Sequence, residues 1–272
     1  MYKLVALDMD GTLLDPAGEI STANRAAIAA ARARGVTVVL ASGRPLAGMR
    51  WALDTLEMTG LQDYVLSFNG ALIQQVGNGA VLHAQGLTAQ DARELQALSR
   101  QLGVHCHAFT ERLGLVTPES SHYTRLEQQH NGIELLVMDF AGLDEDDTVI
   151  KVMMVDEPAR LSAAVAALPQ WVYERFTVVQ STPYFLEFLH RSCNKGEGVA
   201  LLARHLGLGA EQVICVGDGG NDAHMLEFAG LGVAMGNAVE ELKTMADFVT
   251  LSHAEDGVAH VLERFILTPP TA

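Results

Sequence analysis

The feature that most constrains the fold of this 272-residue chain is a series of short apolar segments that alternate with helix-like segments. The apolar segments span residues 4–7, 36–40 and 64–67, and the helix-like segments between them stop near Gly35 and Gly60. A strand that helices cover on both faces is apolar along its whole length. The alternation therefore predicts β-α-β-α-β units with right-handed crossovers, which is an α/β fold built on a Rossmann-like parallel sheet.

This rhythm is interrupted in the middle of the chain. After Asn69-Gly70, the segments 71–75 and 81–83 flank the turn sequence Gly77-Asn78-Gly79, which predicts a hairpin. From there to about residue 189 the predicted helices and strands alternate less regularly, with strands expected at 135–138 and 173–179, among others. We therefore expect a discontinuous catalytic core of residues 1–83 and 190–272, with an α+β cap domain of residues 84–189 inserted into it.

Charge and composition exclude several classes of protein. The chain has 33 acidic against 18 basic residues, a formal net charge of −15, so we expect it to bind neither nucleic acid nor an anionic membrane surface. No apolar run approaches the length of a membrane span, and the first run is too short for a signal peptide. The three cysteines form no C-x-x-C pair, which favours a reducing, cytoplasmic location. None of these features specifies an oligomeric state.

Two carboxylates directly follow the first predicted strand, in the sequence Asp8-Met9-Asp10-Gly11-Thr12. Residues i and i+2 of a strand face the same side, so Asp8 and Asp10 are expected to project together beyond the carboxyl end of the strand. In open α/β sheets this edge is where ligands bind. Crowded carboxylates repel each other unless a cation neutralises them or one of them holds a proton. The alternative is an acidic strand end followed by an ordinary Asp-Gly turn.

Two further positions carry groups suited to an anion. Ser42-Gly43 follows the second predicted strand at the start of a helix, where free amides and the helix dipole favour phosphate. Lys195 begins the first helix after the insertion and could neutralise a phosphate beside the carboxylates. Taken alone, Ser42 could be only a helix cap and Lys195 only a solvated surface charge.

More oxygen ligands follow the strand predicted at 213–216, in the loop Gly217-Asp218-Gly219-Gly220-Asn221-Asp222. Carboxylates and an amide are the ligands that Mg²⁺ prefers, together with water and substrate phosphate. The loop lacks the G-x-G-x-x-G spacing of a dinucleotide site. It predicts a magnesium site, and the alternative is an ordinary Gly/Asp turn. We expect these motifs to follow four strands of one sheet.

Together these residues resemble the haloacid dehalogenase-like (HAD) phosphohydrolases. They are most similar to the Cof-type group, in which a large α+β cap stands between the second and third motifs. The similarity covers essentially the whole chain. The stretches most similar to the YidA-like sugar phosphatases are Asn69-Gly70-Ala71, Lys151-Val152-Met153-Met154, Pro183-Tyr184-Phe185-Leu186-Glu187 and Asn194-Lys195-Gly196.

The resemblance implies a role for each motif residue. Asp8 would be the nucleophile that forms an aspartyl-phosphate, and Asp10 would be the acid and base that serves the leaving alcohol and then water. Mg²⁺ would be held by the Asp8 carboxylate, the Asp10 backbone carbonyl and Asp218, with Asp222 in support. The phosphoryl oxygens would meet Met9 (its amide), Ser42, Gly43 (its amide), Lys195 and Asn221. Ser42 departs from many relatives, which carry Thr there.

The resulting hypothesis is a Mg²⁺-dependent phosphatase that acts on small phosphorylated metabolites, above all sugar phosphates. Two alternatives stay open. A phosphosugar mutase would pass the same aspartyl-phosphate to a second sugar hydroxyl instead of to water. A non-catalytic sensor of Mg²⁺ or of a phosphorylated ligand would use the same groups for binding alone, although a sensor has no use for an intact Asp8/Asp10 pair.

Overall fold

The computed structural model describes residues 1–268, which form two compact units. The first unit contains residues 1–83 and 194–268, and the second contains residues 84–193. Residues 191–193 belong with the second unit because the Cys193 amide donates to the His190 carbonyl and its thiol to the Gln85 carbonyl. No helix in the described part of the chain combines the length and the hydropathy that crossing a bilayer requires.

The described part of the first unit is built on one sheet with the strand order β14-β13-β12-β1-β2-β3-β4-β5. Every neighbouring pair from β14 to β3 is parallel, and β3 pairs with β4 in the antiparallel sense. β1 lies between β2 and β12, so its carboxyl end is central at the sheet edge. The strands are β1 (Leu4–Leu7), β2 (Thr37–Ala41), β3 (Tyr64–Ser67), β4 (Leu72–Gln75), β5 (Val81–Ala84), β12 (Val213–Gly217), β13 (Leu231–Ala234) and β14 (Phe248–Val249).

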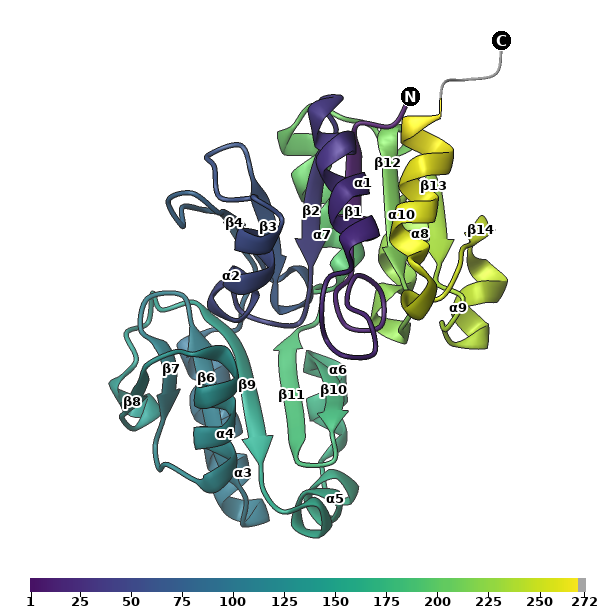
Figure 1. Cartoon of the computed structure of the whole chain (residues 1–272). Coiled ribbons are helices and arrows are strands. Elements are labelled where there is room, and N and C mark those ends of the chain that lie inside the picture. The colour runs from purple at the N-terminus through teal and green to yellow at the C-terminus, as the bar shows by residue number, and fades with distance from the viewer. Residues whose placement is uncertain (269–272) are drawn as a thin grey trace. The chain divides into compact units, whose positions relative to one another are not determined.

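Helices cover this sheet. In Figure 1, α1 and α10 stand together in front of the strands, and these two helices pack against each other. A second contact joins α7 and α8. The helices of the unit are α1 (Thr22–Ala33), α2 (Leu46–Thr55), α7 (Lys195–His205), α8 (Ala223–Phe228), α9 (Glu240–Met245) and α10 (Gly257–Leu262).

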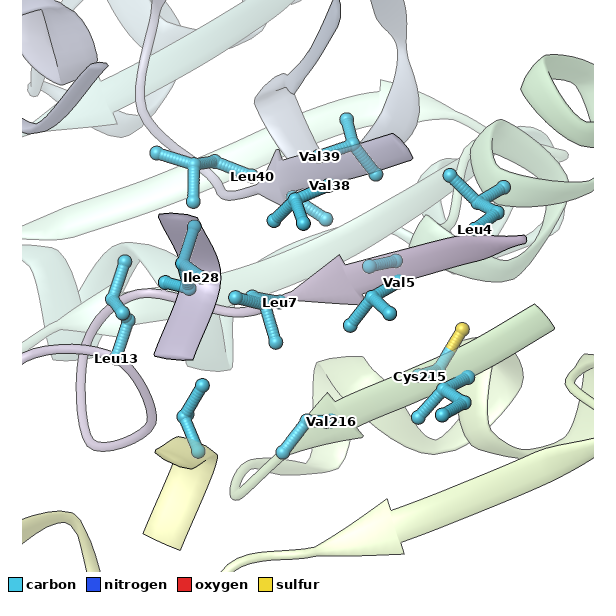
Figure 2. Close-up of a cluster of buried hydrophobic side chains, with 14 of the residues drawn as sticks. Leu4, Val5, Leu7, Leu13, Ile28, Val38, Val39, Leu40, Cys215 and Val216 are labelled. Atoms are coloured by element: carbon cyan, nitrogen blue, oxygen red, sulfur yellow. The ribbon is translucent and has the colours of Figure 1, made fainter. Parts of the chain in front are cut away.

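The hydrophobic core explains why the central strands are apolar throughout. Figure 2 shows Leu4, Val5 and Leu7 of β1 among side chains from β2, β12 and α1, and all three are fully buried. Complete burial stabilises each large apolar side chain by about 1.5 to 3 kcal/mol. The polar residues of the central strands therefore lie at or beyond the strand ends, and the candidate site is found there.

The second unit has its own sheet, with the strand order β10-β11-β9-β6-β7-β8, and its own core around Phe140 and Phe188. Neighbouring strands in this sheet pair in the antiparallel sense, except β7 and β8, which are parallel. Its strands are β6 (His105–Thr110), β7 (Gly114–Thr117), β8 (Leu135–Val137), β9 (Val149–Val155), β10 (Phe176–Thr182) and β11 (Phe185–His190). Its helices are α3 (Ala89–Leu102), α4 (His122–Asn131), α5 (Pro158–Ala166) and α6 (Gln170–Arg175).

Local sequence reasoning was wrong or incomplete at two places in this unit. The strand predicted at 173–179 begins only at residue 176, because residues 170–175 form α6. Arg175 ends this helix with ion pairs to Asp91 and Glu94 of α3, contacts that no local pattern reveals. The sequence analysis also missed β7 and α4. The helix α4 is polar and is bounded by a Ser121 cap and by Gly132 in the left-handed conformation.

Candidate active site

A buried lysine joins two carboxylates at the carboxyl edge of the core sheet. Asp8 follows β1, Asp222 precedes α8, and Lys195 is the first residue of α7. The Lys195 Nζ atom lies 2.5 Å from Asp8 Oδ1 and 2.6 Å from Asp222 Oδ1. Lys195 and Asp222 have no exposed surface, and Asp8 is 7% exposed. A buried ammonium between two carboxylates is the opposite of the solvated surface charge that Lys195 could have been.

Asp222 also shapes the loop that precedes it. Its Oδ2 atom accepts hydrogen bonds from the backbone amides of Asp218 at 3.0 Å and Gly219 at 2.9 Å. Both of its carboxylate oxygens therefore already have donors from this chain. This arrangement suits a carboxylate that supports its neighbours, and it holds Asp218 at the sheet edge.

Asp218 lies against the turn that follows Asp10. The Thr12 hydroxyl donates to Asp218 Oδ1 at 3.0 Å. Gly11 has a φ of +83°, and a Cβ atom on it would lie 2.3 Å from Asp218 Oδ2. Only glycine fits both the left-handed backbone and this close approach. Gly11 and Thr12 therefore hold the Asp218 carboxylate in place, Gly11 by close packing and Thr12 by its hydrogen bond.

The electrostatics of the cluster reflect its burial and its excess of negative charge. Burial raises the pKa of Asp8 to about 7; Lys195 opposes the rise, and Asp222 and Asp218 add to it. Burial also raises the pKa of Asp218; the hydrogen bond from Thr12 opposes this rise, and the negative charge of Asp222 adds to it. Burial alone would lower the pKa of Lys195, but Asp8 and Asp222 hold it above its ordinary value. The lysine is therefore charged, and its single positive charge does not balance the negative charges of the carboxylates.

The cluster fits a divalent cation. Asp8, Asp218 and Asp222 each offer a carboxylate oxygen, and these atoms lie within 4.8 Å of one another. With one ammonium among three carboxylates, the formal charges leave an excess of two negative charges. Hard oxygen donors with this charge excess match the preference of Mg²⁺. Because both Asp222 oxygens already accept hydrogen bonds, Asp8 and Asp218 are better placed to bind the ion.

Asp10 has different surroundings from Asp8. β1 ends at Leu7, so neither carboxylate lies on the strand, and the strand alternation from which a common direction was expected for Asp8 and Asp10 does not extend to them. The Asp10 side chain is 60% exposed and forms a two-point ion pair with Arg44, at 2.7 Å to Oδ1 and 3.1 Å to Oδ2. The exposed carboxylate is held in one orientation while remaining open to solvent.

The predicted anion-binding segment Ser42-Gly43 forms a loop directly before Arg44. Ser42 is buried, and its Oγ atom accepts a hydrogen bond from the Arg44 amide at 3.2 Å. Its carbonyl accepts from the amide of Asn69 at 2.9 Å. The Asn69 side chain lies close to Gly43, where an added Cβ would be 3.3 Å from Asn69 Nδ2. Asn69 Oδ1 in turn accepts a hydrogen bond from the side-chain Nδ2 atom of Asn221 at 3.2 Å.

The structure thus brings most of the predicted residues together in two groups, whereas the Asp10 carboxylate belongs to neither and pairs with Arg44. One group joins Asp8, Lys195, Asp218 and Asp222, and the other links Ser42 and Gly43 to Asn221 through Asn69. The Met9 side chain is fully buried, so only its backbone could meet a ligand. One expectation was wrong: Lys195 does not follow a strand of the core sheet, because the strand before it, β11, belongs to the other sheet.

Sequence reasoning missed Arg44 and Asn69 as parts of this site. Arg44 stood in the sequence next to Ser42-Gly43, and a charged residue at the start of a helix beside an anion site could have been noted. Asn69 has a φ of +57° and follows Phe68 with a φ of +53°. Two successive left-handed residues other than glycine are uncommon and tend to mark functional positions.

Comparison with known proteins agrees with this geometry. The parallel sheet with carboxylates and a lysine at its carboxyl edge places the chain among α/β proteins that carry an acidic site at the ends of their central strands. The sequence profile of the haloacid dehalogenase-like hydrolases matches residues 5–262. The chain therefore belongs to the haloacid dehalogenase-like hydrolases, and the resemblance found in its sequence is confirmed.

Individual relatives indicate which kind of hydrolase this chain is similar to. The chain is 40% identical over 269 residues to "Putative phosphatase YxeH" of Bacillus subtilis (strain 168), covering 98% of this chain and 99% of that protein. A haloacid dehalogenase-like hydrolase from Bacteroides thetaiotaomicron has a TM-score of 0.86 at 32% identity, over 98% of this chain and 100% of that one. The HAD subclass IIB sugar phosphatase BT4131 has a TM-score of 0.78 at 26% identity, over 98% and 100%. These relatives confirm the predicted α/β fold and support a phosphatase activity.

Proposed function

We propose that this protein is a Mg²⁺-dependent phosphatase that hydrolyses small phosphorylated metabolites, chiefly sugar phosphates, through an aspartyl-phosphate on Asp8. The observation that carries the proposal is the buried Lys195 ammonium held between Asp8 and Asp222 beside Asp218. A phosphate monoester dianion repels a carboxylate nucleophile, so attack needs cations close to both. Lys195 supplies one such cation at the Asp8 carboxylate itself.

The reaction follows from the two aspartates of the first motif. An oxygen of Asp8 forms a bond to phosphorus as the bond between phosphorus and the ester oxygen breaks, and Asp10 gives its proton to the departing oxygen. Asp10 then accepts a proton from water, which attacks the aspartyl-phosphate, releases inorganic phosphate and regenerates the Asp8 carboxylate. The exposed Asp10 carboxylate, oriented by Arg44, suits an acid and base that must reach both an alcohol and water.

The remaining motif residues would bind the phosphoryl group. Its oxygens would meet Lys195, the Ser42 hydroxyl, the Asn221 amide, and the backbone amides of Met9 and Gly43. Mg²⁺, held by Asp8, the Asp10 carbonyl and Asp218 with Asp222 in support, would offset the negative charge that develops on the phosphoryl oxygens. The excess of negative charge in the cluster supports such a cation.

The substrate class and the wider organisation belong to the same proposal. Support for sugar phosphates comes from the similarity to the sugar phosphatase BT4131. We assign the inserted unit, predicted as residues 84–189 and found as residues 84–193, to a cap domain. We assign the other unit, predicted as residues 1–83 and 190–272, to the catalytic core. The three cysteines are free and buried, which supports a cytoplasmic, reducing location.

The decisive experiment measures phosphate release from a panel of phosphorylated metabolites, with Mg²⁺ and with a chelator. Wild-type protein should release inorganic phosphate from some members of the panel only with the metal. Asp8→Asn should abolish turnover while still binding the same substrates. Asp54→Asn is a matched change at an exposed carboxylate on α2 and should leave turnover unchanged. Unchanged turnover in Asp8→Asn would refute the mechanism. Interconversion of phosphosugars with little phosphate release would identify a mutase instead.

A further inference from the structure

The segment that follows β13 is tied to both halves of the proposed metal site. The Asn237 side chain donates from Nδ2 to the Gly11 carbonyl at 2.8 Å. Two residues later, the Val239 amide donates to the Asp218 carbonyl at 3.1 Å. One short segment therefore holds the turn after Asp10 and the loop that carries Asp218.

Asn237 is itself fixed on its other side. Its Oδ1 atom accepts a hydrogen bond from the backbone amide of His253 at 2.9 Å. The side chain thus bridges the Gly11 carbonyl and the start of the short helical turn at His253–Glu255. A side chain with both amide atoms bonded to backbone groups cannot shift without breaking one of these bonds.

The place of this bridge matters because Gly11 and Asp218 are in direct contact. The Gly11 backbone adopts its left-handed conformation against the Asp218 carboxylate, and Thr12 donates to the same carboxylate. A movement of the Gly11 turn would therefore change the distance between Asp218 and the groups contributed by the first motif, Asp8 and the Asp10 carbonyl.

We propose that Asn237 is a positioning residue that fixes the Gly11 turn relative to Asp218 and thereby sets the affinity of the site for a divalent cation. The inference rests on the metal site of the proposed function. Groups that orient metal ligands without touching the metal commonly change metal affinity by about 10- to 100-fold when they are removed. We expect the lower end of this range, because Thr12 and Val239 continue to hold Asp218.

Because Asn237 is exposed, its effect on metal binding can be measured separately from an effect on folding. We expect its truncation to leave the hydrophobic core unchanged and the chain folded, which the melting temperature checks. Asn78 offers a matched control, since it is also exposed in the first unit and its Oδ1 atom also accepts a backbone amide, that of Ala80. It lies in the β4–β5 turn, on the far side of the sheet order from β13.

The experiment is isothermal titration of the metal-free protein with Mn²⁺ and Mg²⁺, alongside the melting temperature without metal. Asn237→Ala should raise the dissociation constant about 10-fold, and Asn78→Ala should leave it unchanged. A wild-type dissociation constant in Asn237→Ala would overturn the inference. Asp218→Asn tests the underlying site: if it too binds like wild type, the proposed metal site is wrong, whereas its loss of binding beside a normal Asn237→Ala refutes only the positioning role.

A second pair of variants tests the bridge from its other end. His253 is the first residue of its helical turn, after an extended Ser252, and proline is tolerated at such a position. His253→Pro removes the amide that donates to Asn237, whereas His253→Ala removes the imidazole and keeps that amide. We expect weaker Mn²⁺ binding in His253→Pro than in His253→Ala, and a wild-type constant in the latter. Equal constants in the two variants would overturn the bridge.

Discussion

Replacing Lys195 with methionine tests the central electrostatic claim. Methionine keeps an unbranched stem of similar size and removes the ammonium that lies 2.5 Å from Asp8 and 2.6 Å from Asp222. The lysine has no exposed surface, so water cannot take its place without reorganisation of the site. The variant therefore leaves buried carboxylates without their internal cation.

The expected loss can be worked from this geometry. Removing one partner of a buried ion pair costs about 3 to 5 kcal/mol. Protonation of Asp8, whose pKa already stands at about 7, limits the loss near neutral pH. A carboxyl group whose pKa is raised on folding binds more protons in the folded than in the unfolded chain, so its contribution to stability falls as the pH rises. The defect in Lys195→Met should therefore be larger at pH 8 than at pH 5.

The assay is urea unfolding of the metal-free protein at both pH values, followed by fluorescence. Trp51 lies in the first unit and Trp171 in the second, so a Trp171→Phe background reports the unit that contains Lys195. Adding Asp222→Asn to Lys195→Met should recover part of the loss, because it removes one of the unpaired charges, and excess Mg²⁺ should do the same. A loss below about 1 kcal/mol that does not change with pH would refute the reasoning.

Three further predictions concern other residues. Gly11→Ala should lower stability by about 1 to 2 kcal/mol from left-handed strain alone and weaken metal binding further by displacing Asp218, as measured by melting temperature and Mn²⁺ titration. Arg44→Ala should change stability by less than about 1 kcal/mol, since its pair with Asp10 is exposed, yet reduce kcat; an unchanged kcat would show that Asp10 needs no orientation. Burial and the nearby Lys151 lower the pKa of His107 to about 3. Below pH 6.5 the unfolded chain takes up this proton and the folded chain does not, so lowering the pH destabilises the folded state. Between pH 7 and pH 5 the free energy of unfolding should therefore fall by about 2 kcal/mol more in the wild type than in His107→Gln. Urea unfolding followed by Trp171 fluorescence measures this difference.

The sequence by itself determined the central strands and the chemical groups at their ends. The bounds of β1 and β3 agree with the predicted segments because strands buried on both faces are wholly apolar and end where polar residues begin. The same rule drew attention to Asp8, Ser42 and the loop at 217–222. Fold class and the hydrolase family could both be predicted, since both depend on local runs and motifs that the sequence displays directly.

Only the tertiary structure decided how these groups meet. Lys195 reaches Asp8 across 187 residues, and nothing in its local sequence distinguishes this buried bridge from a surface charge. The bond from Asn237 to the Gly11 carbonyl and the ion pair of Arg44 with Asp10 are also long-range contacts. The helices α4 and α6 escaped prediction for a related reason: caps and contacts with distant residues define them more than apolar periodicity does. Periodicity shows which face of a segment is buried, whereas the order of strands in the sheet determines which side chains become neighbours.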